Sequence, residues 1–400
     1  MQSLILSLDP AMGGGVGTMH QVMRRAHQRL RLDATLAYAR SDRQGRWNPR
    51  VQDGTFDGHP TLSVGYLPSV EYLNYLLPAA ALRRRLREFP VVQLVCGMHS
   101  SSLVPILAGA PFVSWVATPF LDEIASRRAG AAPTASVRLN HGLRALNQRL
   151  ERWTLRFPSV VLALSAYTAR RLEELTGVDS ARVEVLRCPV DHQLFRPDGP
   201  RWSAAPGRYL ISVGRVDDDR KNYAALVRAF APVAARFPDL HLCIVGPADR
   251  SLALADNPVA ALARSTGLGE RVHFPGPLSG ETLAAAYRGA EAYVMTSRQE
   301  GLGIVVIEAQ ASGRPVVIMR CGGSDELVTD GEDGRLVDQG DEAGFSRALG
   351  EALATPVWLA SAGAAGRQKV VQELTHEVFA ARLRDVYRRV FPATAGELAA

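Results

Sequence analysis

The sequence predicts an α/β protein with two doubly wound domains, each built on a parallel sheet. Short, continuous apolar runs alternate with longer helical patterns along the chain, which is typical of buried parallel strands joined by helices. The alternation occurs in two series, separated by a segment with three prolines at residues 188–202. A chain of 400 residues is also too long for one ordinary hydrophobic core.

Each series contains four predicted strands. In the first series they are residues 3–9, 91–97, 111–118 and 160–165, and in the second 208–214, 240–246, 292–297 and 315–320. Helices are expected between them, for example at 17–31, 77–88 and 138–156. We expect a first domain at 1–197 and a second domain at 198–375. A last helix within 376–400 is expected to pack back on the first domain. Ligands of such folds bind at the carboxyl ends of the strands, so we expect the ligand between the domains.

The composition indicates a globular protein, with 47% hydrophobic and 22% charged residues. The four cysteines lie far apart, show no metal-ligand spacing and are expected to be reduced: Cys96, Cys188, Cys243 and Cys321. The start, MQSLILSLDP, lacks the basic lead and the long apolar run of a signal peptide. No stretch reaches the roughly 18 apolar residues of a membrane span. These features predict a cytoplasmic protein.

Charge is distributed unevenly along the chain. Residues 1–197 carry a net charge of +9, from 24 Arg, no Lys and 15 acidic residues, whereas residues 198–400 carry −3. A basic first half is compatible with peripheral contact with a membrane through residues 72–89, and a solvated surface helix is the simpler alternative. Aromatic residues make up only 7% of the chain and do not alternate with basic ones, which argues against nucleic-acid binding.

A glycine-rich segment, LDPAMGGGVGTMH (8–20), follows the first predicted strand. Glycines let the backbone approach a ligand closely, and N–H groups at the start of a helix attract anions. The spacing matches neither the dinucleotide fingerprint nor the P-loop. A tight turn from strand to helix explains these glycines equally well.

Two cations follow a predicted strand in SVGRVDDDRKN (212–222). Arg215 and Lys221 lie six residues apart, and cations at the carboxyl end of a parallel strand can bind a diphosphate. The alternative is that both cations pair with the neighbouring acidic residues, Asp217, Asp218 and Asp219.

Two glutamates, Glu300 and Glu308, flank an apolar run in SRQEGLGIVVIEAQASGRPVV (297–317). The nearby glycines predict a tight turn into a helix, whose first N–H groups, on Leu302, Gly303 and Ile304, would face an anion. Burying an unpaired carboxylate is costly, so each glutamate needs a partner rich in hydrogen-bond donors. A sugar for Glu300 and a ribose for Glu308 would meet this need.

The order of GGGVG, GRVDDDRKN, EGLGIVVIE, ASGRPVV and GGSDELVTDGEDGRLV resembles the retaining GT-B glycosyltransferases of family 4. The resemblance covers nearly the whole chain and is strongest over residues 208–340. The segment SARVEVLRCPVDHQLFRP is similar to the family's inter-domain segment, with Cys188-Pro189-Val190-Asp191 in place of Asn-Gly-Val-Asp.

The resemblance implies a GT-B fold: two Rossmann-like domains with a cleft between them and a C-terminal helix crossing back to the first. It implies that the N-terminal domain, 1–197, binds the acceptor and that the C-terminal domain, 198–375, binds the nucleotide sugar. It implies transfer of a sugar from a UDP- or GDP-sugar to a hydroxyl of a saccharide, lipid-linked or natural-product acceptor. No metal and no cofactor are expected, because cations and a helix terminus neutralise the leaving diphosphate. The alternatives are a GT-B-fold nucleotide-sugar epimerase and a non-catalytic sugar-nucleotide-binding subunit.

The resemblance also assigns individual residues. Glu300 matches the catalytic residue at the donor sugar, and Glu308 matches the ribose ligand. The residues expected at the diphosphate are Gly14, Gly15, Arg215, Lys221, Leu302, Gly303 and Ile304. Those expected beside the ribose or base are Gly246, His273 and Phe274.

One position departs from the family pattern. The family often has a histidine after the strand that corresponds to PFVSWVAT (111–118), where this chain has Ala117 followed by Thr118. The Thr118 hydroxyl or His99 could supply the missing hydrogen bonding. Together with Asp122, these residues are the candidates for acceptor binding or sugar specificity.

Overall fold

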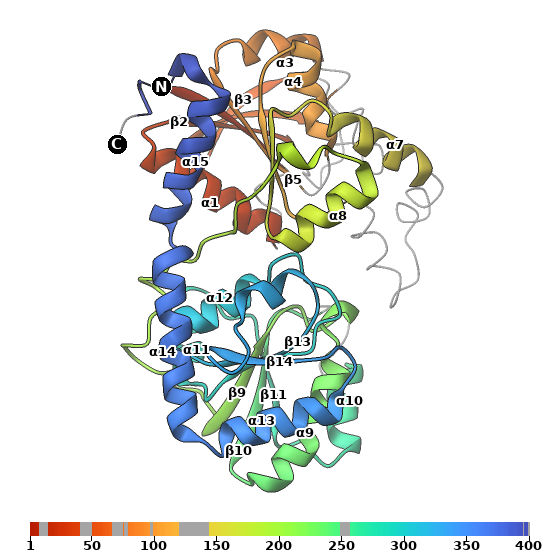
Figure 1. Cartoon of the computed structure of the whole chain (residues 1–400), viewed down its shortest axis with the longest axis vertical. Helices are drawn as coiled ribbons and strands as arrows, with labels where there is room; N and C mark the ends of the chain where they lie inside the picture. Colours follow the sequence, from red (N-terminus) through yellow and green to blue (C-terminus); the bar gives the residue numbers. More distant parts are fainter. Residues whose placement is uncertain are drawn as a thin grey trace. The chain divides into compact units, whose positions relative to one another are not determined.

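The computed structural model describes residues 1–7, 15–40, 50–65, 75, 79–96, 99–119, 144–248, 257–394 and 396–398. The chain divides into two compact units (Figure 1). The first unit combines Met1–Cys188 with His376–Ala400, and the second is Pro189–Thr375. None of the helices in the described ranges has the length and apolar content that crossing a membrane requires.

The first unit contains an eight-stranded sheet in the order β3-β4-β2-β1-β5-β6-β7-β8. Its strands are β1 (Gln2–Leu6), β2 (Asp33–Arg40), β3 (Gln52–Phe56), β4 (His59–Gly65), β5 (Val91–Cys96), β6 (Val113–Val116), β7 (Val160–Ala163) and β8 (Val183–Val185). Its α-helices are α1 (Gly15–Arg29), α3 (Ala79–Leu86), α4 (Leu103–Ala108), α7 (Arg144–Thr154), α8 (Ala166–Thr176) and α15 (His376–Val390). All neighbouring strands are parallel except β3 and β4, which are antiparallel.

The second unit contains a six-stranded parallel sheet in the order β11-β10-β9-β12-β13-β14. Its strands are β9 (Arg208–Val213), β10 (Leu240–Val245), β11 (Val272–Gly276), β12 (Tyr293–Met295), β13 (Val316–Met319) and β14 (Gly334–Val337). Its α-helices are α9 (Tyr223–Arg236), α10 (Pro258–Ser265), α11 (Gly280–Gly289), α12 (Ile304–Ala311), α13 (Glu342–Leu353) and α14 (Pro356–Glu373). Counted from β9, the order reads 3-2-1-4-5-6, which places the topological switch point between β9 and β12.

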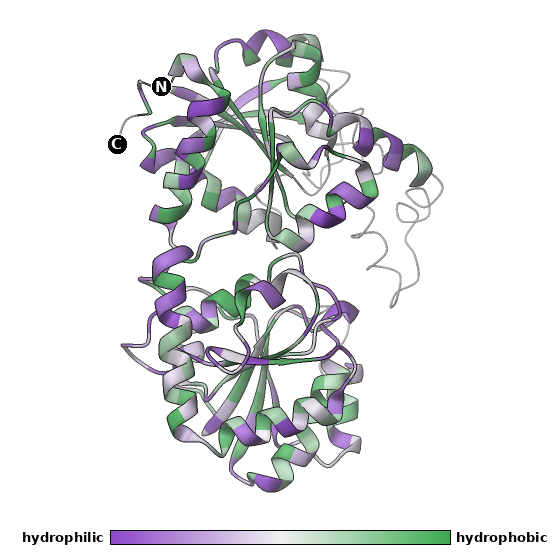
Figure 2. Ribbon diagram, in the orientation of Figure 1, coloured by the Kyte–Doolittle hydropathy of each residue, from purple (hydrophilic) through white to green (hydrophobic). Residues whose placement is uncertain are grey.

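The central strands are buried because helices cover both faces of each sheet. Leu210, Val294 and Val317 have no exposed surface and belong to one apolar cluster in the second unit. Figure 2 shows the strands as largely apolar and the outer sides of many helices as polar. Burial on both faces explains why these strands are continuous apolar runs in the sequence.

The C-terminal helix α15 packs against α1 within the first unit (Figure 1). A buried polar chain joins the two helices to the sheet: Ser3 Oγ lies 2.9 Å from His27 Nδ1, and His27 Nε2 lies 2.7 Å from the Tyr387 hydroxyl. That hydroxyl donates to Gln93 Oε1 at 2.9 Å. Burial lowers the pKa of His27 to about 3, so the imidazole is neutral. The side chains of Trp115 and Phe379 add a ring contact, with centroids 5.0 Å apart.

The fold class predicted from the sequence is confirmed, and the eight predicted strands all contain strands of the structure. Six strands of the structure were not predicted: β2, β3, β4, β8, β11 and β14. The residues of β3, QDGTF, are mostly exposed, so this strand lacks the apolar run that identified the others.

The joint between the units also differs from the expected position, because residues 189–197 lie within the second unit. Val190 N donates to Leu374 O at 2.9 Å. Arg367 Nη1 donates to the carbonyl oxygens of His192 and Phe195 at 2.9 and 2.8 Å. These bonds attach the proline-rich segment to α14 of its own unit. Cys188, Cys243 and Cys321 are buried free thiols.

Candidate functional site

The site is built at the carboxyl ends of β9, β12 and β13, next to the switch point. Two glycines bring the backbones of β9 and β10 together there, and Gly214 N donates to Val245 O at 2.9 Å. Gly246 has a φ of 152°, and a β-carbon on it would lie 1.9 Å from Gly214 O. A β-carbon on Gly214 would lie 2.8 Å from both Lys221 Cε and the Tyr223 hydroxyl. The glycine at 214 therefore leaves room for Lys221 to fold over the end of β9.

The loop between β9 and α9 is fixed by its own charges. Arg215 Nη2 donates to Asp217 Oδ2 at 2.8 Å, and its side chain is 63% exposed. Asp218 accepts hydrogen bonds from both the backbone and the guanidinium of Arg220, the latter at 2.6 Å. The alternative of pairing with neighbouring aspartates thus holds for Arg215, whose exposed guanidinium still has donors for a ligand.

Lys221 pairs with a different residue. Its Nζ donates to Glu300 Oε1 at 2.8 Å, and the two side chains are only 18% and 15% exposed. The two residues come from the loops after β9 and β12, on the two sides of the switch point. The structure thus joins the cation expected at the diphosphate to the carboxylate expected at the sugar.

Glu300 is held at this position by its backbone. Its N–H donates to Cys321 O and its carbonyl accepts from Gly323 N, both at 2.8 Å, as in a short parallel bridge. Arg298 adds hydrogen bonds from its backbone to Arg220 O at 2.7 Å and from its side chain to Asp219 O at 3.2 Å. These contacts connect the loop that carries Glu300 to the loops after β9 and β13.

Helix α12 begins directly after Glu300 and presents free donors. Gly303 precedes the helix with a φ of 84°, and a β-carbon there would lie 2.9 Å from Ser324 Cβ, so glycine is required. Within the described ranges, the N–H groups of Leu302, Gly303 and Ile304 donate to no protein group. The start of a helix with free donors favours an anion at this position.

Glu308 lies on the second turn of α12 and accepts a hydrogen bond from the Tyr287 hydroxyl at 2.9 Å. Burial raises the pKa of Glu308 to about 7, and the bond from Tyr287 works in the opposite direction. The carboxylate has no cationic partner in the described part of the chain. Keeping this carboxylate charged therefore costs free energy in the free protein. Additional hydrogen-bond donors would stabilise the charged form.

The other predicted residues of the second unit lie at or beside β10 and β11. Gly246 follows β10 at the site edge described above. His273 Nε2 lies 2.9 Å from His241 Nδ1, and Phe274 packs against the apolar core. Burial lowers the pKa of His273, and the adjacent His241 lowers it further. Their part in base binding remains a prediction.

In the first unit, the predicted residues follow strand ends or helix starts. Ala117 and Thr118 form a bend after β6 and are both half-buried. Residue 99 begins a short 3-10 helix, His99–Ser102, after β5, and α1 starts at Gly15. Gly14 and Asp122 lie outside the described residues. The roles expected for these residues remain predictions.

The sequence reasoning missed the residues that support the two glutamates. Tyr287 lies on α11, and no feature of its surroundings in the sequence links it to Glu308. Arg298 stands two residues before Glu300, so its position beside the predicted site was the only available signal. The described residues contain no group of three side chains suited to bind a metal ion.

Two family models match the chain. Glycosyltransferase Family 4 matches residues 13–194, and Glycosyl transferases group 1 matches residues 207–355. The chain belongs to glycosyltransferase family 4. The Lys221–Glu300 pair and the start of α12 lie within the second of the two matched regions.

Curated relatives of this family 4 chain include two bacterial transferases. A D-inositol 3-phosphate glycosyltransferase of Nocardia farcinica is 37% identical over 202 residues, which are 48% of this chain and 44% of the relative. A GDP-mannose-dependent alpha-(1-6)-phosphatidylinositol monomannoside mannosyltransferase of Mycolicibacterium smegmatis is 33% identical over 241 residues, or 57% and 61% of the two chains. The matches span about half the length of these relatives.

Solved structures show the same fold for this family 4 chain. Sucrose-phosphate synthase from Thermosynechococcus elongatus has a TM-score of 0.77 at 22% identity, covering 98% of this chain and 100% of that one. HepE of Anabaena in complex with UDP has a TM-score of 0.76 at 18% identity, covering 97% and 100%. These likenesses establish the two-domain GT-B architecture and nothing about substrates.

Proposed function

We propose that the protein is a retaining glycosyltransferase that moves a sugar from a UDP- or GDP-sugar to an acceptor hydroxyl. The observation that carries the proposal is the Lys221–Glu300 ion pair beside the free N–H groups at the start of α12. It combines a cation, a helix N-terminus and a carboxylate at the switch point of a parallel sheet. This set matches a donor whose diphosphate is anionic and whose sugar is rich in hydroxyl groups.

Each residue has a role in this proposal. Arg215 and Lys221 bind the diphosphate together with the N–H groups of Leu302, Gly303 and Ile304. Glu308 accepts hydrogen bonds from the ribose diol, and Glu300 accepts them from the donor sugar. Release of Lys221 from Glu300 to the phosphates leaves the Glu300 carboxylate available for the sugar.

The proposed reaction needs no side-chain base. The acceptor oxygen forms its bond to the anomeric carbon on the face from which the diphosphate leaves, and the bond from that carbon to the phosphate oxygen breaks. The acceptor proton passes to the leaving phosphate. Preorganised cations and helix donors that stabilise the negative charge of the leaving diphosphate supply the catalysis. The configuration at the anomeric carbon is retained.

The relatives suggest the first substrates to test. One is named for a GDP-mannose donor, and both are named for acceptors that contain inositol. Donor hydrolysis should therefore be screened with UDP- and GDP-sugars, and transfer with inositol phosphate and phosphatidylinositol mannoside, using mass spectrometry to identify products. A donor that changes only its sugar configuration would favour the epimerase alternative. Binding without any turnover across the screen would favour the non-catalytic subunit.

Calorimetry with UDP and GDP tests the diphosphate site directly. Charge-assisted hydrogen bonds contribute about 1.5–3 kcal/mol each, so Arg215→Ala and Lys221→Ala should each weaken binding at least roughly tenfold. Arg347→Ala is the matched control, because Arg347 is 69% exposed on α13. Unchanged affinity in both site variants would contradict the proposal.

We also propose that this cytoplasmic enzyme contacts an anionic membrane through its first unit. On and just after α3, Arg83, Arg84 and Arg87 are exposed. On and just after α7, Leu146, Trp153 and Phe157 are 50%, 39% and 43% exposed, among several arginines. Exposed aromatic and basic side chains on one helix are typical of interfacial binding. Co-sedimentation with phosphatidylglycerol vesicles should fall in Trp153→Ala, and equal sedimentation with neutral vesicles would contradict it.

A further inference from the structure

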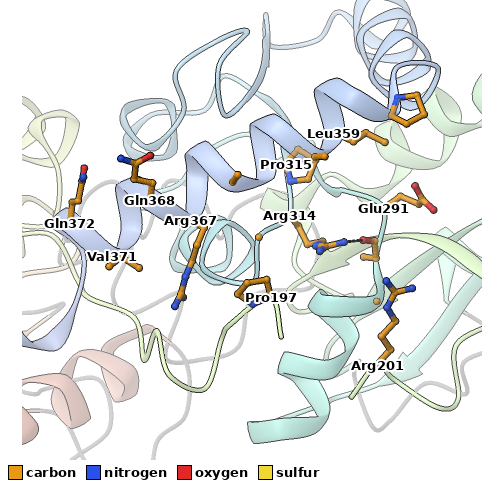
Figure 3. A pocket seen from close by; sticks show the side chains of 16 residues that line it. Pro197, Arg201, Glu291, Arg314, Pro315, Leu359, Arg367, Gln368, Val371 and Gln372 are labelled. Carbon is orange, nitrogen blue, oxygen red and sulfur yellow. Dashed lines mark hydrogen bonds between the residues drawn. The ribbon is translucent and has the colours of Figure 1, made fainter. Parts of the chain in front are cut away.

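A cavity lies in the second unit, away from the candidate donor site. It has a volume of about 800 Å³, which is within the range of small-molecule pockets. Its base is formed by residues that precede β12 and β13, such as Glu291, Arg314 and Pro315, and its wall is formed by α14 (Figure 3). The candidate donor site lies at the opposite, carboxyl ends of these strands. Helix α12 separates the two, since Gly303 precedes it and Arg314 follows it.

Two guanidinium groups of this cavity have unused hydrogen-bond donors. Arg201 is exposed and makes no hydrogen bond or ion pair with the residues that the structure describes. Arg314 donates from Nη1 to Ala290 O at 3.1 Å and from Nε to Ser312 O at 3.3 Å, which leaves Nη2 without a partner in the described ranges. Burial lowers the pKa of Arg314, and the positive charge of Arg201 lowers it further. Both arginines line the same cavity.

The carboxylate in the cavity offsets only part of this positive charge, although Glu291 acts to raise the pKa of Arg314. Glu291 Oε1 accepts a hydrogen bond from Arg208 Nε at 3.2 Å, and that arginine also pairs with Asp239. Figure 3 shows Arg201 and Arg314 on the same side of the cavity, next to Glu291, with Arg367 beyond Pro197. Arg367 is already engaged, because its Nη1 donates to three backbone carbonyls. One side of the cavity therefore carries an excess positive charge.

The facing wall is largely apolar, although Gln368 and Gln372 of α14 also line it. Helix α14 contributes Leu359, Ala360 and Val371, the last of which is 42% exposed. The small side chain of Ala360 is exposed and leaves the wall open. An inorganic anion would satisfy the arginines but leave this wall in water. A ligand with an apolar body and one anionic group would satisfy both sides.

We propose that this cavity binds a small organic anion, in which a carboxylate, phosphate or sulfonate bridges Arg201 and Arg314 and an apolar body lies against α14. The site is independent of the donor site and of the proposed transferase activity. Charge-assisted hydrogen bonds from two guanidinium groups would provide the orientation, and burial of the apolar body would provide additional affinity.

Two fluorescent probes that differ by one sulfonate test this proposal. 8-Anilinonaphthalene-1-sulfonate has an apolar body and an anionic group, whereas N-phenyl-1-naphthylamine has only the body. Both are titrated against the full chain in the presence of saturating nucleoside diphosphate, which occupies the donor site. We expect saturable binding of the sulfonate and at least about tenfold weaker binding of the neutral probe.

Two variants assign the binding to this cavity. Arg201→Glu should weaken the sulfonate probe at least about tenfold while leaving the neutral probe unchanged, because it removes the charge and not the wall. Ala360→Trp should weaken both probes by filling the cavity from an exposed position. Arg347→Glu is the matched surface control and should alter neither. If either cavity variant binds the sulfonate as tightly as the unmodified protein, the proposal is wrong, and absence of saturable binding would overturn it too.

The same variants separate this site from the donor site. Arg201→Glu and Ala360→Trp should keep the affinity of the unmodified protein for UDP or GDP, because neither residue lies at the carboxyl ends of the strands. Loss of nucleotide affinity together with probe affinity would mean that the probe binds at the donor site. That result would overturn the assignment of probe binding to the cavity beside α14.

Discussion

Lys221 and Glu300 form an ion pair of 2.8 Å across the switch point of the second sheet. Each side chain satisfies the other in the free protein, so neither leaves an unpaired charge in this half-buried position. A bound diphosphate would compete with Glu300 for Lys221, and a sugar hydroxyl would then replace the lysine at the carboxylate. The pair is therefore a resting arrangement of two groups that have separate roles in the proposed reaction.

The first prediction follows from this competition. Glu300→Gln keeps the size of the side chain but removes the charge that holds Lys221. Turnover should fall by roughly 100-fold, the magnitude typical of losing one preorganised electrostatic group. The affinity for UDP or GDP should stay the same or increase, because Lys221 is released. Calorimetry and initial rates measure the two effects, with the exposed Glu351→Gln as a control; near-normal turnover would exclude Glu300 from catalysis.

The second prediction concerns Glu308, whose pKa is raised to about 7 by burial. The free folded protein binds this proton more tightly than the unfolded chain, so Glu308 costs stability increasingly as pH rises from about 4.5 to 7. The full cost is on the order of 3 kcal/mol above this window. Glu308→Gln should therefore raise the melting temperature at pH 8 and leave it nearly unchanged below pH 4.5.

Ligand binding separates this stability effect from function. If Glu308 accepts hydrogen bonds from a ribose, Glu308→Gln should weaken UDP or GDP several-fold and leave inorganic pyrophosphate unchanged, because pyrophosphate has no ribose. A melting temperature that does not rise at pH 8 would contradict the burial argument. Equal loss of pyrophosphate and nucleotide affinity would contradict the ribose assignment.

Much of the fold was predictable because strands buried on both faces are apolar along their whole length. The predicted runs 208–214 and 240–246 became β9 and β10 within one residue, since strands covered on both faces must be continuously apolar. The same rule fails at a sheet edge. β3 is mostly exposed and pairs only with β4, in the antiparallel direction, so it did not need such a run.

The site was predictable in its parts but not in its pairing. Gly303 and Glu308 stand in local patterns, a tight turn and the second turn of a helix, that short-range rules describe well. The ion pair of Lys221 joins residues 79 positions apart, and nothing local distinguishes Glu300 from the three nearer aspartates. The contact of Tyr287 with Glu308 likewise depends on how α11 and α12 pack.

The third prediction is that turnover survives an excess of EDTA. Asp217 and Asp218, in the loop that carries Arg215 and Lys221, accept hydrogen bonds from Arg215 and Arg220. Because arginine already pairs with these carboxylates, we expect cations of the protein, and not a metal ion, to neutralise the diphosphate. Loss of turnover on chelation, restored by Mg²⁺ or Mn²⁺, would assign these aspartates to a metal site.

The fourth prediction concerns the buried chain through His27 and Tyr387. The pKa of His27 is lowered to about 3, whereas an unfolded histidine titrates near 6.5. The unfolded chain therefore takes up a proton that the folded protein excludes, and stability falls as pH drops below 6.5, by about 1.4 kcal/mol per unit.

His27→Gln isolates this effect. The variant should be less stable at neutral pH, because it loses the bonds to Ser3 and Tyr387, but its stability should fall less than that of the unmodified protein between pH 7 and pH 5. Thermal unfolding at the two pH values measures the difference. His192→Gln, at a half-exposed position, should show the unmodified pH dependence. Parallel loss of stability in His27→Gln and the unmodified protein would mean that His27 is protonated in the fold.

The last prediction concerns the two residues after β6. Ala117 and Thr118 form a half-buried bend at the carboxyl end of this strand, the end at which doubly wound sheets bind ligands. A methyl group and a hydroxyl leave space where the family often has a histidine ring. We expect these residues to determine which sugar is accepted, because a site with fixed hydrogen-bonding groups rejects sugars that leave them unpaired. Ala117→His and Thr118→Val should change the ratios of kcat/KM among donors more than the maximal rate on the preferred donor. Equal loss of rate on all donors, with the original ranking kept, would show that neither side chain distinguishes the sugar.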